Sequence, residues 1–140
     1  MGRHVLLVLY CACLCGCQTS TVGGTADAPP ASVPADVAAL IASDMASRLS
    51  EQLPRSSGPL KLEDETTDFA IALVTSLKTS GYQIASSTQP QAIALAYRLD
   101  RSGSELLASL STPRLRLARL YVVSGSQAMP ASPLSVIMLQ

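Results

Sequence analysis

Cys17 is the residue of this 140-residue chain whose type and position best suit covalent chemistry. Before it come two basic side chains, Arg3 and His4, then an apolar run over residues 5–14, and then the small residue Gly16. This order is typical of an export signal that is removed from the mature protein. A retained membrane anchor is the less favoured alternative, because an apolar run of about 10 residues is shorter than the roughly 20 that a spanning helix needs.

The residues that close this run are Leu14-Cys15-Gly16-Cys17, and they resemble the lipobox of bacterial lipoproteins. In that family the Cys at the position of Cys17 acquires a thioether-linked diacylglycerol, the signal is cut between Gly16 and Cys17, and the new amino group is acylated. The resemblance implies a signal peptide over residues 1–16 and a protein held on membrane lipid through Cys17. The other three cysteines would leave with the signal, so the cysteine count predicts neither a disulfide framework nor a zinc site.

Loss of the signal would also remove the single histidine, His4, and leave 124 residues (140 minus 16) with no Trp and no unmodified Cys. Ser-His-Asp, Cys-His and His-ligated metal mechanisms each need a residue type that this mature chain would lack. A cell-wall enzyme with a Ser-Lys site is the alternative from another functional class, but Lys61 and Lys78 stand in no Ser-x-x-Lys pattern. We therefore expect no catalysis, no metal and no cofactor beyond the acyl chains.

Charge indicates which partners to expect. The mature chain would keep nine Lys or Arg, because Arg3 leaves, against ten Asp or Glu, and this balance does not favour direct nucleic-acid binding. Four of the acidic residues cluster at 63, 64, 65 and 68, but they lack the alternating oxygen ligands and turn glycine of a calcium loop. A favourable interaction with the N-terminus of a helix explains them more simply. The expected partners are proteins and membrane lipid.

Residues 17–32 are small, polar and rich in Pro and Gly, so they are predicted as a lipidated flexible tether. A coil of this length holds its domain on the order of 20 Å from the lipid. The remaining residues, 33–140, are enough for one domain with a single core.

Two segments have the apolar spacing of helices. The first is predicted over residues 34–53, with Pro34 in its first turn and Leu40 widening a stripe of apolar residues that recur every four positions. The second is predicted over residues 67–80, where Thr66 or Thr67 can cap the start. Gly81 followed by Tyr82 predicts a Schellman ending for this second helix.

The next segments have the pattern of strands. Residues 60–62 precede the second helix and residues 82–84 follow it, which predicts a β-α-β unit. Residues 93–99 alternate most cleanly between large apolar side chains and small or charged ones, and residues 105–111 suit the second strand of a hairpin. Residues 100–103, which end in a glycine, are predicted as the turn between them.

The strand predicted over residues 114–123 has a pattern that changes along its length. Its first two leucines point inward if Arg114 and Arg116 point outward, but Arg119 then falls on the inward side. Either this strand is covered on both faces beyond residue 118, or a β-bulge shifts its phase there.

The chain ends with a predicted loop over residues 124–133 and a predicted edge strand over residues 134–139. The order of elements favours an α+β fold, in which two helices pack on one face of a mostly antiparallel sheet of about 4–6 strands. The other face would then carry a set of small and basic residues, namely Ala94, Ala96, Arg98, Arg114 and Arg116. Arginines on such a face are either simply solvated, or they form a docking surface for an acidic strand or loop of a partner.

Several short strings along the chain are similar to the TrbH family of conjugal-transfer lipoproteins. They are Gly16-Cys17-Gln18-Thr19-Ser20, Asp68-Phe69-Ala70-Ile71-Ala72-Leu73-Val74, Lys78-Thr79-Ser80-Gly81-Tyr82, Tyr97-Arg98-Leu99-Asp100 and Ala118-Arg119-Leu120-Tyr121. The resemblance implies a lipoprotein of a type IV secretion apparatus, lying beside the outer-membrane complex that passes DNA between cells. The family has no known catalytic residues to transfer, so only Cys17 maps onto this chain as a site.

Position 18 bears on the membrane that would hold the lipid anchor. Gln18, rather than Asp, follows the predicted acylated Cys, and this resembles lipoproteins that are released to the outer membrane, where the domain would face the periplasm. The alternative within the same class is an accessory lipoprotein of envelope assembly or transport, similar in layout to the plug of lipopolysaccharide export pores. Neighbouring genes for a transfer ATPase and a pilus would favour conjugation over this alternative.

Overall fold

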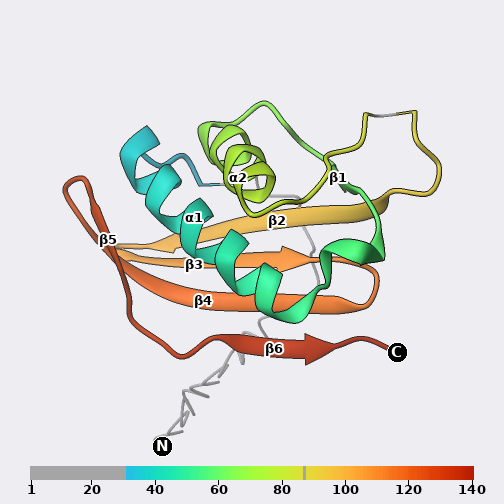
Figure 1. Ribbon diagram of the computed structural model, residues 1–140. Coiled ribbons are helices and arrows are strands. Elements are labelled where there is room, and N and C mark those ends of the chain that lie inside the picture. Colours follow the sequence, from blue (N-terminus) through green and yellow to red (C-terminus); the bar gives the residue numbers. More distant parts are fainter. Residues whose placement is uncertain (1–30, 87) are drawn as a thin grey trace, which may run out of the picture.

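The computed structural model describes residues 31–86 and 88–140, which form two helices on one face of an open six-stranded sheet (Figure 1). The strand order is β1-β2-β3-β4-β5, with β6 also paired to β4. Only β1 and β2 are parallel, so the predicted α+β class with a mostly antiparallel sheet is confirmed. The elements are α1 (Ala35–Gln52), a 3-10 turn η1 (Arg55–Ser57), β1 (Leu60–Leu62), α2 (Asp68–Thr79), β2 (Ile93–Ser102), β3 (Glu105–Ser111), β4 (Leu115–Ser124), β5 (Gln127–Pro130) and β6 (Ser135–Met138).

Helix α1 buries its predicted stripe but not Leu40. Val37, Ile41, Met45 and Leu49 are buried, as are the alanines at 38, 42 and 46. Leu40 is 44% exposed, so the prediction that it widens the stripe was wrong. The buried surface widens on the alanine side instead, because small side chains let α1 pack closely against α2. The helix begins at Ala35, one residue later than predicted, and Pro34 occupies the N-cap.

Helix α2 begins and ends at the predicted signals. The Thr67 hydroxyl oxygen accepts a hydrogen bond from the Ala70 N–H at 3.1 Å, which caps the start. At the other end Gly81 has a φ of +92°, the Tyr82 N–H donates to the Leu77 carbonyl, and the Gly81 N–H donates to the Lys78 carbonyl. These two bonds define the Schellman motif, so that prediction is confirmed.

Two of the predicted connections differ in the structure. The strand predicted over residues 82–84 is only a single parallel bridge between Ile84 and Leu60, because this segment exchanges backbone bonds with Leu60 alone and does not follow β1 further. Strand β2 runs to Ser102 instead of ending at Leu99. Gly103 therefore begins a two-residue hairpin loop with a φ of +60°, where it was predicted to end a longer turn.

The predicted loop over residues 124–133 contains a strand. Gly125, with a φ of +57°, turns the chain so that β5 pairs with the second half of β4, while β6 pairs with the first half. Between them Ser132 accepts a hydrogen bond from the Leu120 N–H, and the Ala131 N–H donates to the Leu120 carbonyl. Strand β4 keeps an unbroken register with β3, so the predicted bulge within it is wrong. Covering of both faces beyond residue 118 is wrong as well, because no described helix lies on the open face, and the alternation continues with Arg119 on the helix side, where it pairs with Asp44.

The core lies between the two helices and the sheet face that they cover (Figure 1). The most buried large side chains that the sheet contributes are Leu60, Leu95, Leu106, Leu110, Leu117 and Tyr121. Among the described residues no helix covers the opposite face, which carries the alternate positions of β2, β3 and β4 (Figure 1). The open face and the β6 edge are thus the parts of the sheet that the described helices leave available.

Candidate docking surface at the β6 edge

Residues 1–30 lie outside the described part of the chain, so the predicted cleavage site at Gly16 and the predicted lipidation site at Cys17 stay predictions. Of the predicted site residues, the structure describes Arg114 and Arg116. Both lie at the end of the sheet where the β3–β4 turn meets β6, and both side chains are exposed.

Arg114 and Arg116 differ from the other described arginines because their side chains form no ion pair or hydrogen bond with the described residues. Each of the remaining five has a partner: Arg48 with Asp44 and Glu51, Arg55 with the Ser80 carbonyl, Arg98 with Asp100, Arg101 with the Gly103 carbonyl, and Arg119 with Asp44. Of the three arginines predicted on the open face, Arg98 is therefore paired, and the unpaired charge lies at Arg114 and Arg116, near β6.

The hydrogen-bonded turn between β3 and β4 fixes the backbone that carries these two arginines. The buried Thr112 accepts hydrogen bonds from the backbone N–H groups of Leu115, at 3.0 Å, and Arg114, at 3.4 Å. The Thr112 N–H in turn donates to the Leu115 carbonyl. With its backbone held in this way, Arg114 precedes β4, while Arg116 stands within β4 between Ser111 on β3 and Ile137 on β6.

A cavity of about 620 Å³ opens beside Arg114. Its walls come from the end of α1, the start of β2, the β3–β4 turn and Met138 on β6. The apolar side chains among them include Leu53, Ile93 and Leu115. The sequence could not have indicated this cavity, because its walls come from segments that are far apart along the chain.

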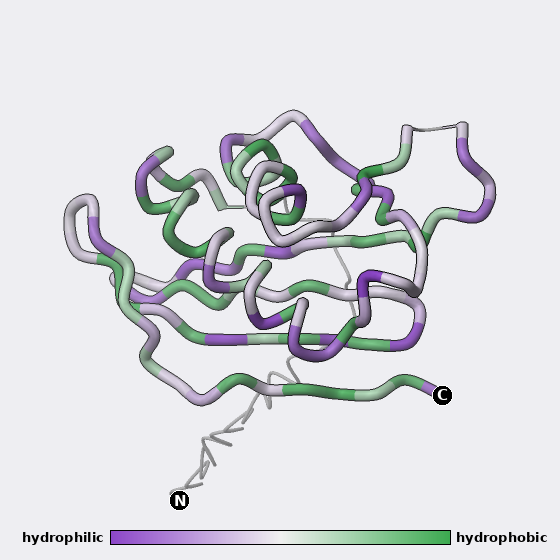
Figure 2. The backbone as a smooth tube through the Cα atoms, in the orientation of Figure 1, coloured by the Kyte–Doolittle hydropathy of each residue, from purple (hydrophilic) through white to green (hydrophobic). Residues whose placement is uncertain are grey.

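Strand β6 exposes apolar side chains beside this cavity. Val136, Ile137 and Met138 are 40%, 48% and 70% exposed, and the strand stands out as hydrophobic in Figure 2. The signal for this surface was present in the sequence as an apolar run that was predicted only as an edge strand. Exposed apolar residues that lie together on a soluble domain indicate a contact surface.

Arg119 takes no part in this surface, because it points toward α1. Its guanidinium lies 2.8 Å from the Asp44 carboxylate, and the Tyr121 hydroxyl donates to the same carboxylate oxygen at 2.5 Å. Burial raises the pKa of Tyr121 strongly, and the hydrogen bond and charge of Asp44 raise it further. The arginine that disturbed the apolar pattern of β4 is thus part of an interaction that joins the sheet to the helix.

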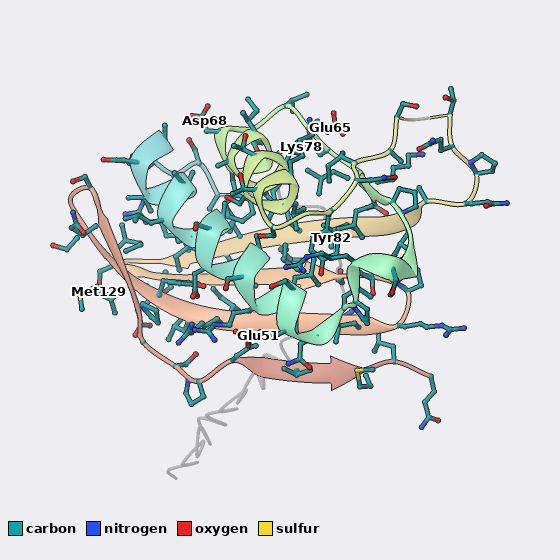
Figure 3. All side chains as sticks on the ribbon, in the orientation of Figure 1. Glu51, Glu65, Asp68, Lys78, Tyr82 and Met129 are labelled. Carbon is teal, nitrogen blue, oxygen red and sulfur yellow. The ribbon has the colours of Figure 1, made fainter. Side chains whose placement is uncertain are left out.

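The acidic residues at the start of α2 lie away from β6, as Glu65 and Asp68 show in Figure 3. Thr66 donates to the Asp64 carboxylate through its side chain at 2.7 Å and its backbone at 2.9 Å, and these bonds lower the pKa of Asp64. In the described part of the chain no group of three or more His, Cys, Asp or Glu residues is placed to hold a metal ion. None of the described helices has the length and apolar character needed to cross a membrane.

Comparisons with known proteins agree over nearly the whole chain. The family "Conjugal transfer protein TrbH" matches residues 19–139. A protein of Sinorhizobium fredii (strain NBRC 101917 / NGR234), named "Probable conjugal transfer protein TrbH", is 39% identical over 145 residues that cover 98% of each chain. No solved structure matches.

Proposed function

The chain belongs to the TrbH family of conjugal transfer proteins. We propose that it is a lipid-anchored, non-catalytic component of the envelope apparatus that moves DNA between cells. Family membership indicates involvement in conjugal transfer. The anchor, the membrane and the mode of action are our proposal: Cys17 carries the acyl chains, the outer membrane holds them, and the folded domain binds other proteins of the transfer channel.

The sequence around Cys17 supports the anchor. Each buried CH₂ of an acyl chain adds about 0.8 kcal/mol of membrane affinity, so three chains hold the protein without help from the domain. Cys17→Ser is expected to leave an unprocessed precursor that incorporates no labelled palmitate. Labelling that persists in this variant would overturn the lipidation proposal, and recovery of the wild-type mature protein with the inner membrane would overturn the outer-membrane assignment.

The observation that carries the proposed mode of action is the pair of unpaired arginines. Arg114 and Arg116 keep their charge free beside exposed apolar residues, whereas every other described arginine is paired. Such a surface suits protein contact and needs no catalytic group.

Replacing Arg114 and Arg116 together with Ser tests this role. We expect weaker co-purification with transfer proteins and a lower mating frequency, while the melting temperature stays near that of the wild type because exposed, unpaired charges add little stability. Arg98→Ser is the matched control, since Arg98 is exposed but already paired with Asp100. Full co-purification of the double variant would show that these arginines are only solvated.

A further inference from the structure

We propose that β6 receives an extended segment of another transfer protein as an additional strand of the sheet, and that this segment is acidic and apolar. The inference rests on the proposed function and identifies the surface and the chemistry of the partner. Addition of a strand to a sheet edge obtains affinity from backbone hydrogen bonds and specificity from side-chain contacts.

The backbone of β6 is free on the side away from β4. The Leu139 N–H donates to the Arg114 carbonyl at 2.8 Å, which makes these two residues a hydrogen-bonded pair. Hydrogen-bonded and non-hydrogen-bonded pairs alternate along an antiparallel ladder, so Ile137 also bonds to β4 while Val136 and Met138 do not. The N–H and C=O groups of Val136 and Met138 therefore point away from the sheet.

The rest of the sheet edge is less able to accept a strand. By the same alternation Pro130 is an outward-pointing residue of β5, and it has no N–H to offer. On the opposite edge β1 is three residues long, and Leu60 already exchanges backbone bonds with Gln83 and Ala85. Beyond β1 this edge continues along β2, which carries the charged residues Arg98, Asp100 and Arg101. Edge strands are commonly protected by charged side chains, by proline or by short length. Strand β6 contains neither charge nor proline, so it is the least protected edge among the described residues.

Side chains on both faces of β6 would contact an added strand. Val136 and Met138 share the helix side of the sheet with Leu117 and Leu115, and Met138 also lines the 620 Å³ cavity. A guest side chain beside Met138 would stand at the mouth of this cavity, which suits an apolar residue. On the open face Ile137 lies beside Arg116, so a guest side chain there would meet an apolar residue and an unpaired guanidinium.

Charge decides between a partner segment and a second copy of this chain. Arg114 and Arg116 carry the only charged side chains among 112–118 and 133–140, so two copies paired through β6 would bring together basic side chains with no acidic side chain between them. An acidic segment satisfies the same groups. The β6 edge offers only two outward-facing residues, so the contact with a guest strand is weak by itself. Confinement of both proteins in one membrane-bound assembly would raise their effective concentration enough for binding.

Site-specific photo-cross-linking of the full-length lipoprotein in mating cells tests the proposal. A photoreactive residue at Val136 is expected to cross-link to an extended segment of a transfer protein that contains Asp or Glu, whereas one at Leu40, which is exposed on α1, is expected not to. Cross-links from Val136 to a second copy of this chain, or to no protein, would overturn the proposal.

Val136→Pro provides the functional test, because it removes an N–H that bonds to nothing within the protein. We expect recovery of the partner to fall about ten-fold, which is the effect of losing one backbone hydrogen bond at an interface. If the melting temperature of this variant shows misfolding, Val136→Glu is used in its place, since it adds to the edge a charge that repels an acidic guest but keeps the backbone N–H. Undiminished recovery of the partner with a folded variant would overturn the role of β6.

A deletion strain separates failure of this proposal from failure of the proposed function. If the wild-type gene does not restore mating, the proposed function is wrong. If the wild-type and Val136→Pro genes restore mating and recovery of the partner equally, only the β6 proposal is wrong.

Discussion

Removal of the Asp44 carboxylate is expected to destabilise the domain more than removal of any exposed charge. Asp44 accepts from the Arg119 guanidinium at 2.8 Å and from the Tyr121 hydroxyl at 2.5 Å. The side chains of Asp44 and Arg119 are 22% and 16% exposed, so water can replace little of what is lost. In Asp44→Ala, Arg119 keeps a mostly buried charge with only the Ser132 carbonyl as acceptor, and Tyr121 loses its acceptor.

The size of this loss follows from Arg119, which loses its carboxylate partner, and from Tyr121, which loses its acceptor; Arg48 also loses Asp44 but keeps Glu51. Removing one member of a buried ion pair costs about 3–5 kcal/mol, and residual exposure favours the lower part of that range. The unsatisfied Tyr121 hydroxyl adds about 1 kcal/mol. We therefore expect Asp44→Ala to lower the free energy of unfolding by about 3 to 4 kcal/mol. At about 4 °C per kcal/mol for a domain of this size, the melting temperature falls by roughly 12 to 16 °C.

Urea denaturation and thermal melting of the purified protein measure this change. Glu51→Ala is the matched control, because Glu51 pairs with an arginine on the same helix but is 48% exposed, and we expect a change of less than about 0.5 kcal/mol. The triple variant Asp44→Leu, Arg119→Met, Tyr121→Phe should regain most of the stability, since apolar side chains replace all three polar groups together.

Two results would refute this reasoning. An Asp44→Ala variant within about 1 kcal/mol of the wild type would mean that Arg119 and Tyr121 find other partners or water. A triple variant as unstable as Asp44→Ala would mean that lost packing, and not an unpaired buried charge, is the cause.

Two further predictions concern the end of α2 and alkaline pH. Gly81→Val should lower the free energy of unfolding by roughly 1 to 2 kcal/mol, because a β-branched residue is strained at positive φ and its Cβ would lie 3.1 Å from the Arg55 side chain. An unchanged melting temperature would contradict the assignment of Gly81 to the end of α2. Above pH 10.0, the ordinary pKa of tyrosine, Tyr121 loses its proton in the unfolded chain but keeps it in the folded protein. The free energy of unfolding should therefore fall as pH rises, by up to about 1.4 kcal/mol per pH unit for Tyr121. Denaturation of Tyr121→Phe across pH 9 to 11 should show a shallower decline, and equal slopes for the two proteins would argue against the raised pKa.

Local patterns predicted most of the fold because the determinants of these elements are local. The Thr67 cap and the Gly81 ending act within one helical turn, and the alternation in β2 and β3 reflects a sheet with one covered face. Strand β5 was missed because Gly125 and Pro130 give its segment the composition of a loop, while its pairing with β4 depends on a neighbouring strand. Leu40 was misplaced because the packing of α2 decides which side of α1 is buried.

The candidate surface could be predicted only in part, for the same physical reason. Alternation was enough to place Arg116 outward, because it depends on the strand alone. The lack of a partner for Arg114 and Arg116 depends on where every acidic side chain lies, and the cavity depends on four separate segments. Both interpretations of Arg119 from the sequence were wrong, because its partner Asp44 is 75 positions away.

All four side chains of β6 are exposed, so this strand is held mainly by its backbone bonds to β4. Opening of β6 would uncover little of the core, so it should require far less free energy than global unfolding, and its amide hydrogens should exchange sooner than those between β3 and β4. The proposed binding edge would then belong to an easily rearranged strand of the sheet. Strand β6 could shift its register to suit a guest segment, or dissociate from β4, while the helices and central strands stay folded.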